Sequence, residues 1–390
     1  GHLSLVQEVF VTLGASQCGF CTPGMIAAIT GYLLCTTHPT GAGAVESLAG
    51  NICRCTGYTS VKEAAEEIAG AVGVSPASNS ACIGHLKHLV EKRVIPRYFL
   101  SVAPLLADIQ IDPSEAEGLP QPSDDTVMVA GGTDLYAAEP EKVIGTDPVF
   151  LSERPELTVI GVSRERVTVG ACSTVEDIKE SSIFSGTGNF QDSLLRISSP
   201  QIRSRATAGG NIVNASPIGD LTIMFLALEA VLVLESNTGT RRVPLKEFYK
   251  GYKELDLRSG ELVTSVEFRK PAAHSFCNFE KVAMRQRMDI ASVNSAACLE
   301  ISGGVIGSAA VSAGGVAPIP LYLESLGTFL KNRKITADTV EKAAEVAMES
   351  ICPIDDVRGS ADYKRKLLGR LVKAHFLALF PEILDPEDLL

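Results

Sequence analysis

Four cysteines close to the amino terminus constrain what this chain can fold into more than any other feature. Cys18 and Cys21 form a C-x-x-C pair, and Cys53 and Cys55 form a C-x-C pair beyond an intervening helical stretch. Thiolates spaced in this way can converge on one site. Such soft ligand sets bind zinc or an iron–sulfur cluster, and four cysteines are the usual ligands of a [2Fe-2S] cluster. The spacing alone therefore leaves two interpretations open, a structural zinc site and an iron–sulfur centre.

The residues around these cysteines predict a small all-α domain. Apolar residues recur at helical spacing from Leu3 to Leu13, and residues 61–68 are rich in strong helix formers. We expect this domain to cover residues 1–73. The seven residues that follow are rich in Ser, Pro and Asn, the composition of a linker, so we expect a linker over residues 74–95.

The remainder of the chain predicts two α+β domains, over residues 96–270 and 271–390. A length of 390 residues favours two or three domains in total. In the first α+β domain, short runs typical of β-strands end in glycine-containing turns, at residues 127–130, 157–160 and 166–169. In the second, residues 292–299 and 305–312 flank a Gly-Gly turn and predict a hairpin, which helical patterns follow up to the carboxy terminus.

The charge and the apolar runs of the sequence argue against a nucleic-acid partner and against a membrane span. Lys and Arg total 35 against 46 Asp and Glu, and the resulting net charge of −11 disfavours a nucleic-acid partner. The longest apolar run, 221–234, contains Glu229 and is shorter than the roughly 20 residues that a membrane span needs. The first residues lack the basic start and cleavage site of a signal peptide. We therefore expect a cytoplasmic protein that binds neither nucleic acid nor membrane.

The other six cysteines have no ligand spacing. In a reducing compartment we expect them to be small buried apolar side chains rather than disulfides. They are Cys35, Cys82, Cys172, Cys277, Cys298 and Cys352. The six histidines likewise form no ligand cluster, and no catalytic acid or base is evident on this chain.

Two glycine-rich segments are candidates for phosphate binding. Residues 129–135 and 207–211 each contain paired glycines, which allow close backbone approach and present N–H groups to phosphate oxygens. Two amide-rich loops of this kind suit a diphosphate. Neither segment fits the Rossmann or Walker pattern, and each one alone is also typical of a hairpin turn.

The two cysteine motifs, GASQCGFCTPGM at residues 14–25 and NICRCTGY at 51–58, resemble the helical [2Fe-2S] domain of the molybdenum hydroxylases. That family includes xanthine dehydrogenase, aldehyde oxidoreductase and carbon monoxide dehydrogenase. The resemblance implies that the four cysteines hold the cluster nearest the molybdenum cofactor.

The glycine-rich segments are similar to those of the flavoprotein of the same family, whose FAD-binding domain is of the vanillyl-alcohol-oxidase type. Residues 288–294 and 357–363 resemble its carboxy-terminal domain, of the carbon monoxide dehydrogenase flavoprotein type. The resemblance implies that both glycine-rich segments contact FAD. It implies further contacts from one acidic residue that follows the second segment and from three other residues. These residues are Met128, Val129, Ala130, Gly131, Gly132, Thr133, Asp134 and Leu135, then Thr207, Ala208, Gly209, Gly210, Asn211 and Asp220, and finally Ile197, Val263 and Lys281.

Two of the implied flavin residues have alternative interpretations. Residues 248–255 resemble the segment beside the isoalloxazine ring, so Tyr252 would shield that ring and gate nicotinamide access. On residue chemistry alone, Tyr252 is equally an ordinary half-buried tyrosine and Lys281 a solvated lysine on a strand.

The resemblance implies an electron-transfer subunit that passes electrons from a molybdopterin-binding large subunit through [2Fe-2S] to FAD and then to NAD, within a dimer of heterodimers. Xanthine is the leading substrate because both domains are fused on one chain, and an aldehyde or another N-heterocycle is the alternative. The family's plant-type ferredoxin domain is missing, so we expect it to be lost, removed or supplied by another polypeptide. A hypothesis of a different class is a non-redox adaptor that binds zinc and a nucleotide.

Overall fold

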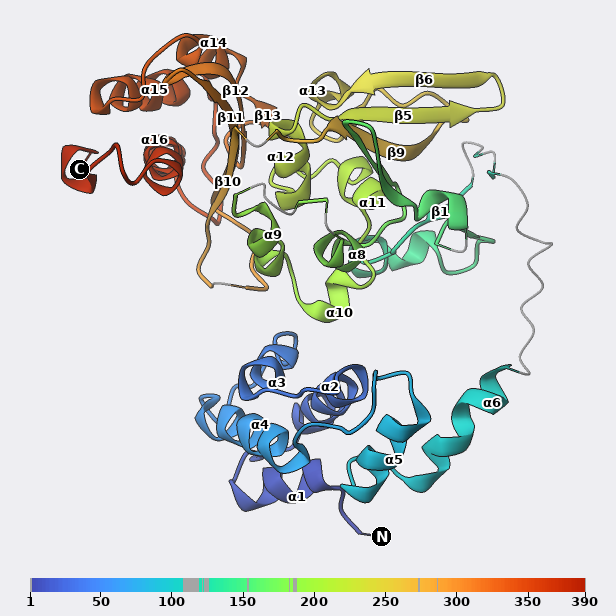
Figure 1. The fold of residues 1–390 in the computed structure, drawn as a ribbon. Coiled ribbons are helices and arrows are strands. Elements are labelled where there is room, and N and C mark those ends of the chain that lie inside the picture. The colour runs from blue at the N-terminus through green and yellow to red at the C-terminus, as the bar shows by residue number, and fades with distance from the viewer. Residues whose placement is uncertain are drawn as a thin grey trace. The chain divides into compact units, whose positions relative to one another are not determined.

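The structure is a computed structural model that describes residues 2–107, 119–120, 122, 126–152, 154–181, 183–184, 188–272, 274–285 and 287–389. The chain divides into two compact units, Gly1–Glu115 and Ala116–Leu390 (Figure 1). The first unit is helical and the second is α+β, so the predicted multidomain fold class is confirmed.

The first unit is built from helices packed around one apolar core. They are α1 (Leu5–Thr12), α2 (Thr22–Cys35), α3 (Gly41–Ser47), α4 (Thr59–Val72), α5 (Ile83–Glu91), the 3₁₀ helix η1 (Arg97–Ser101) and α6 (Val102–Ala107). α1 begins with a capping box, in which the Ser4 hydroxyl accepts from the Gln7 amide and the Gln7 side chain accepts from the Ser4 amide. Phe10, Ile29 and Ile68 are buried in the core. The helices predicted from the apolar spacing and the helix-former run are confirmed.

The predicted linker over residues 74–95 is wrong. The segment contains α5, and Leu89, Val94 and Ile95 are buried in the core of the helical unit. The Leu5 amide donates to the Arg93 carbonyl oxygen at 2.9 Å, which ties the end of this segment to α1. The Ser- and Pro-rich composition describes only the first residues, whereas the apolar face of α5 decides the packing. The unit also includes η1 and α6, so the second domain does not begin at residue 96.

The second unit contains a five-stranded antiparallel sheet in the order β3-β4-β9-β5-β6. The elements of this half are β1 (Met128–Val129), α7 (Leu135–Ala138), η3 (Pro140–Lys142), β2 (Val149–Phe150), η4 (Pro155–Leu157), β3 (Ile160–Ser163), β4 (Arg166–Gly170), α8 (Val175–Glu180), α9 (Phe190–Ser193), η5 (Leu194–Arg196), α10 (Pro200–Arg203), α11 (Ala208–Val213), α12 (Asp220–Ala227), β5 (Val231–Ser236), β6 (Gly239–Pro244), α13 (Leu245–Phe248), β7 (Tyr249–Gly251), β8 (Glu254–Leu255) and β9 (Leu262–Arg269). The strand predicted at 157–160 is displaced, because Pro155–Leu157 forms η4 and β3 starts at Ile160. α12 is buried from Leu221 onward, and its only polar residues are Asp220 and Thr222.

A second, four-stranded antiparallel sheet follows, in the order β10-β11-β12-β13. Its elements are β10 (Ser275–Val282), β11 (Val293–Ser302), β12 (Val305–Gly314) and β13 (Leu321–Tyr322), followed by α14 (Glu324–Leu330), α15 (Ala337–Glu349), α16 (Ala361–Leu379) and η6 (Pro386–Leu389). α14, α15 and α16 cover one face of this sheet and α12 covers the other (Figure 1). The predicted hairpin with its Gly303-Gly304 turn is confirmed as β11 and β12.

The expectation for the remaining cysteines is wrong in most cases. Cys277 on β10 and Cys298 on β11 are directly opposite in register and form a disulfide. Cys35 and Cys352 are exposed and Cys82 is half-buried. Cys172 is buried as expected, and burial raises the pKa of its thiol to about 11. The two cysteines meet because of the register between β10 and β11. No local spacing in the sequence reports that register, so the sequence could not indicate the disulfide.

Candidate functional site

The structure brings the four predicted ligand cysteines together from two segments. Cys18 and Cys21 precede α2, and Cys53 and Cys55 lie between α3 and α4. The Cys18 and Cys55 sulfur atoms are 3.6 Å apart. Cys21 and Cys53 form a second pair through a side-chain hydrogen bond. This pairing fits a cluster of two irons held by four thiolates.

Hydrogen-bond donors surround the buried member of the set, Cys53. The Thr56 hydroxyl lies 3.3 Å from the Cys53 sulfur, and the Cys55 amide donates to the same sulfur at 3.4 Å. Hydrogen bonds from the Thr56 side chain and backbone and from the Cys55 amide lower the pKa of Cys53 to about 6. A backbone hydrogen bond from Phe20 lowers the pKa of Cys18. Such donors stabilise the thiolate form of cysteine, which is the form that binds metal. Hydrogen bonds to the ligand sulfur atoms also tune the reduction potential of a bound cluster.

The other two cysteines of the set have raised pKa values. Burial raises the pKa of Cys21, and the hydrogen bond with Cys18 raises the pKa of Cys55. Across the described part of the chain, no group of three or more His, Cys, Asp or Glu side chains converges on a single-ion site. The cysteine set lies at the surface of its unit, since Cys18 and Cys55 are exposed and the intervening Phe20 is 94% exposed.

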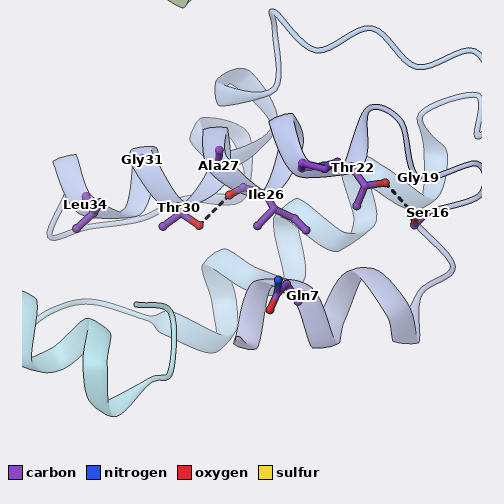
Figure 2. A pocket seen from close by; sticks show the side chains of 10 residues that line it. Gln7, Ser16, Gly19, Thr22, Ile26, Ala27, Thr30, Gly31 and Leu34 are labelled. Carbon is purple, nitrogen blue, oxygen red and sulfur yellow. Dashed lines mark hydrogen bonds between the residues drawn. The ribbon is translucent and has the colours of Figure 1, made fainter. Parts of the chain in front are cut away.

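A groove of about 640 Å³ adjoins the first cysteine segment. Figure 2 shows it between α1, which contributes Gln7, and α2, which contributes Ile26 and Thr30. The Ser16 and Thr22 hydroxyls, 2.8 Å apart, bridge its end near Gly19. The groove carries no charged side chain, and it belongs to the helical unit rather than to the glycine-rich segments.

The first glycine-rich segment provides a cradle of free backbone donors. Among the described residues, the consecutive amides from Gly131 to Asp134 donate to no protein acceptor. A Cβ atom at Gly131 would lie 1.7 Å from the Arg205 carbonyl oxygen, so only glycine fits there. Gly132 has a φ of +70° and packs against the Tyr136 ring. Free amides beside left-handed glycine are the donors that a diphosphate requires.

The second glycine-rich segment differs from the prediction. It is neither a loop nor a hairpin turn, because Ala208–Val213 forms α11 with Thr207 as its N-cap. The Ala208 and Gly209 amides donate to the carbonyl oxygens of Ser173 and Ala171, at 3.0 and 2.7 Å. The Gly210 amide donates to the Thr207 hydroxyl. These amides are therefore engaged within the protein, and the segment's contribution to a cofactor site would come from its surface atoms.

The two glycine-rich segments are nevertheless neighbours. Gly131 abuts the backbone of Arg205 and Ala206, which lead directly into Thr207. Asn211 lies on α11, and its side-chain oxygen accepts from the Thr222 amide and hydroxyl. The structure thus places the free amides beside the start of α11 and couples α11 to α12.

Asp220 and Lys281 form a buried ion pair. The Lys281 ammonium lies 2.6 Å from Asp220 Oδ2, and their side chains are only 5% and 11% exposed. The interpretation of Lys281 as a solvated strand lysine is therefore wrong. Burial raises the pKa of Asp220, while Lys281 and Asn294 oppose that change. Sequence reasoning missed Asn294 as a member of this group, because no local spacing connects it with Asp220, 74 residues away.

Ile197 and Val263 are core residues of the second unit. Both side chains are buried in the apolar core of the second unit, and Val263 is part of the central strand β9. Packing accounts for the burial of both side chains, and the contact of each residue with FAD stays a prediction.

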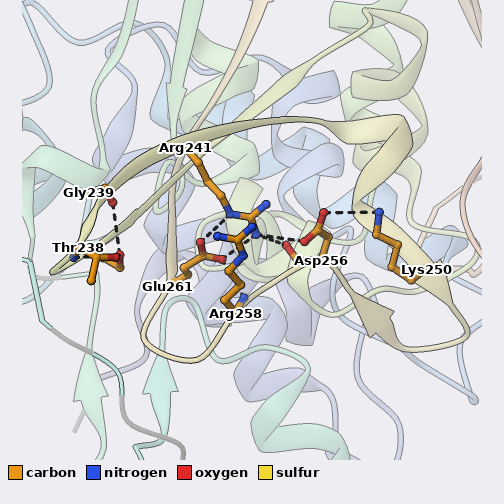
Figure 3. Close-up of polar contacts among 8 residues, drawn as sticks. Thr238, Gly239, Arg241, Lys250, Asp256, Arg258 and Glu261 are labelled. Atoms are coloured by element: carbon orange, nitrogen blue, oxygen red, sulfur yellow. Dashed lines mark hydrogen bonds and ion pairs between the residues drawn. The ribbon is translucent and has the colours of Figure 1, made fainter.

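Tyr252 lies in the turn between β7 and β8 and is 65% exposed, so the half-buried alternative is wrong. The adjacent Lys253 ammonium contacts the Asn214 side-chain oxygen at 3.0 Å, which holds this turn near the end of α11. Figure 3 shows a further anchor, in which Arg241 contacts Glu261 at 2.6 Å and Asp256 at 3.2 Å. Tyr252 itself is exposed in a turn that the Lys253–Asn214 contact joins to the end of α11.

Three models of known protein families match successive parts of the chain. Residues 1–66 match the [2Fe-2S] binding domain, residues 112–271 match the FAD binding domain in molybdopterin dehydrogenase, and residues 279–379 match the CO dehydrogenase flavoprotein C-terminal domain. The fold and its two sites define an iron–sulfur flavoprotein. These matches favour iron–sulfur over zinc and contradict the hypothesis of a non-redox adaptor.

Individual relatives define the family. The nicotinate dehydrogenase FAD-subunit of Eubacterium barkeri is 30% identical, over 70% of this chain and 93% of the relative. The structure of carbon monoxide dehydrogenase from Hydrogenophaga pseudoflava is similar with a TM-score of 0.62 and 28% identity, covering 67% of this chain and 92% of that one. The chain belongs to the family of electron-transfer FAD/[2Fe-2S] subunits of the molybdenum hydroxylases.

A third relative matches nearly the whole chain. Xanthine dehydrogenase 1 of Arabidopsis thaliana is 26% identical over 94% of this chain, and the chain spans 32% of that relative. Among the described residues, no helix is both long and apolar enough to cross a membrane.

Proposed function

We propose that this chain is the electron-transfer subunit of a xanthine dehydrogenase, which takes electrons from a molybdopterin-binding large subunit and delivers them to NAD. When bound, a [2Fe-2S] cluster supplies one-electron transfer and FAD supplies one- and two-electron transfer. The extent of similarity supports the group of relatives that includes xanthine dehydrogenase over the nicotinate and carbon monoxide dehydrogenases, and the fusion of the iron–sulfur and FAD domains on one chain makes xanthine the first candidate substrate. The xanthine dehydrogenase relative matches 94% of this chain, whereas the nicotinate and carbon monoxide dehydrogenase relatives match 70% and 65%.

The residues have distinct roles in this proposal. Cys18, Cys21, Cys53 and Cys55 would hold the cluster. The amides from Gly131 to Asp134 would bind the FAD diphosphate, as would surface atoms of the Thr207–Asn211 segment.

The Asp220–Lys281 pair would place fixed charges beside the flavin, where such charges tune its electronics. Tyr252, exposed at its turn, would cover the flavin and control access of nicotinamide.

Oxidation of an aldehyde is the second candidate function. Aldehyde oxidase 4 of Mus musculus is 27% identical over 95% of this chain, as extensive a match as that of the xanthine dehydrogenase relative. The substrate is bound on the large subunit, so the residues of this chain do not discriminate between the two reactions.

Cofactor content tests the sites themselves. We expect purified protein to contain FAD near stoichiometry and about two iron and two sulfide per chain, the content of one [2Fe-2S] cluster. Absorption spectroscopy with iron, zinc, sulfide and flavin assays on one sample makes the measurement. Colourless protein loaded with zinc and free of flavin would contradict the proposal.

The proposed substrate and electron acceptor can be tested on the purified complex. We expect the chain to copurify with a molybdopterin-binding subunit in a cytoplasmic dimer of heterodimers, with a ferredoxin-like [2Fe-2S] domain present on one of the chains. That complex should reduce NAD with xanthine and not with aldehydes. Preference for an aldehyde would replace xanthine with the second candidate, and failure to reduce NAD would require another acceptor.

A further inference from the structure

Three elements that are distant in sequence converge on the Asp220 carboxylate. Asp220 is the first residue of α12, Lys281 lies on β10 and Asn294 lies on β11. Lys281 and Asn294 are directly opposite in the register of the two strands. Lys281 binds Oδ2 of Asp220 at 2.6 Å, and the Asn294 amide nitrogen donates to Oδ1 at 2.5 Å. Both oxygens of one carboxylate are therefore held from the same sheet.

The orientation of the Asn294 amide follows from its partners. Its nitrogen also donates to the Ile218 carbonyl oxygen at 3.2 Å, just before α12. The reversed orientation would direct an amide oxygen at two acceptors, so it is incompatible with this site. Asn294 is fully buried, and its own Oδ1 has no hydrogen-bond partner among the described residues.

Gly314 on β12 provides the space for this arrangement. A Cβ atom at Gly314 would lie 2.2 Å from Asn294 Oδ1 and 3.0 Å from the Pro217 carbonyl oxygen. The Asn294 side chain therefore fits only because residue 314 on β12 is a glycine. A buried amide that leaves one acceptor unpaired costs free energy, which its two donor contacts must offset.

The carboxylate group of an aspartate rotates easily about its χ2 bond, because the energy minima of this terminal sp³–sp² torsion are broad. Lys281 alone would hold one oxygen and leave the carboxylate plane free to turn. We propose that Asn294 is a positioning residue that fixes the orientation of the Asp220 carboxylate toward the flavin. This inference rests on the proposed assignment of Asp220 and Lys281 to the FAD site.

The test compares two buried asparagines of the same sheet. Asn294→Leu has nearly the same volume and removes the donor. Asn278→Leu is the matched control, because Asn278 on β10 is also buried but donates to His375 at 2.8 Å and to Glu280 at 3.1 Å, and not to Asp220. FAD is removed from the 390-residue chain, and the dissociation constant of FAD is measured by flavin fluorescence.

We expect Asn294→Leu to weaken FAD binding at least about tenfold, the range for losing a hydrogen bond to a charged group. Asn278→Leu should leave the dissociation constant within about threefold of wild type. Asn294→Thr keeps a donor at the position and should recover part of the affinity, and it replaces the leucine variant if that variant does not fold.

A double-mutant cycle separates positioning from general destabilisation. In an Asp220→Asn background, Asn294→Leu should have little further effect on FAD affinity, because the carboxylate that it orients is gone. An equal loss in both backgrounds, or wild-type affinity in Asn294→Leu, would overturn the inference. If the wild-type chain itself binds no FAD, the proposed function fails instead.

Discussion

Gly131 illustrates how one missing side chain shapes the cofactor candidate site. A methyl group there would meet the Arg205 backbone carbonyl, which cannot move as the end of a flexible side chain could. Gly131→Ala should therefore displace the cradle of free amides and destabilise the second unit by about 1–3 kcal/mol. FAD content and denaturant unfolding measure the two effects.

Gly161 is the matched control for that substitution. It lies in β3, and a Cβ atom there would meet nothing within 4 Å. Gly161→Ala should leave FAD content unchanged and stability unchanged or slightly raised. Equal behaviour of the two variants would show that the close contact at Gly131 is unimportant.

His375 on α16 is the buried centre of a polar chain through the second sheet. Asn278 donates to His375 Nδ1 at 2.8 Å, and His375 Nε2 lies 3.0 Å from the Ser295 hydroxyl. That hydroxyl donates onward to the Ser312 carbonyl oxygen at 2.8 Å. These contacts suit a neutral imidazole, and burial lowers the pKa of His375 to about 3.

The lowered pKa of His375 predicts acid sensitivity. In the unfolded chain a histidine takes up a proton near pH 6.5, whereas the folded one remains neutral down to about pH 3. The unfolded state therefore binds more protons in this window, and stability present above pH 6.5 is lost as pH falls. Between about pH 7 and about pH 5, His375 should account for about 2 kcal/mol of lost unfolding free energy.

Denaturant unfolding across that pH range measures the effect. His375→Gln should be less stable than wild type at neutral pH, because the hydrogen-bonded chain is disturbed, but should lack this part of the pH dependence. A wild-type slope retained in His375→Gln would show that other groups cause it.

At the scale of elements, the β10–β11 pair carries two features of the second sheet. The Cys277–Cys298 disulfide joins the strands on the same face from which Lys281 and Asn294 reach Asp220. A cross-link that spans a sequence separation of 21 stabilises by up to about 3 kcal/mol, mainly by restricting the unfolded chain.

Replacing both cysteines with alanine should lower the free energy of unfolding by up to about 3 kcal/mol. Cys352→Ala, which changes an exposed cysteine without a disulfide, is the control and should have little effect. Thiol titration of unfolded wild-type protein checks the bond itself. Ten reactive thiols without reductant, the full cysteine count, would contradict the disulfide.

Elements also show where local sequence signals are insufficient. The hairpin of β11 and β12 and helices α1 and α4 were predictable, because apolar spacing and turn glycines are local properties. The Gly209-Gly210 segment was predicted as a loop, yet it forms α11. Gly209 packs against Ala171 so closely that a Cβ atom would lie 2.7 Å from the Ala171 methyl group. The close contact with Ala171, which is distant in the sequence, explains why a glycine is needed at position 209, and a turn does not.

At the scale of the whole molecule, the cysteine set and the glycine-rich cradle belong to different compact units with separate cores. Loss of one site should therefore leave the other intact. Cys53→Ser should remove about two iron per chain and leave FAD content unchanged. Cys35→Ser, which alters an exposed cysteine outside the set, should keep both. Loss of flavin together with iron would contradict the independence of the units.

The sequence by itself determined the two kinds of unit, the four candidate ligand cysteines and the glycine-rich segment around Gly131 and Gly132. These depend on spacing along the chain and on the conformational freedom of glycine, which neighbouring residues decide. Only the tertiary structure decided that α5 belongs to the helical core, that Cys277 and Cys298 form a disulfide, and that Asn294 reaches Asp220. Each of these contacts joins segments that are distant in the chain, and strand register and helix packing create them.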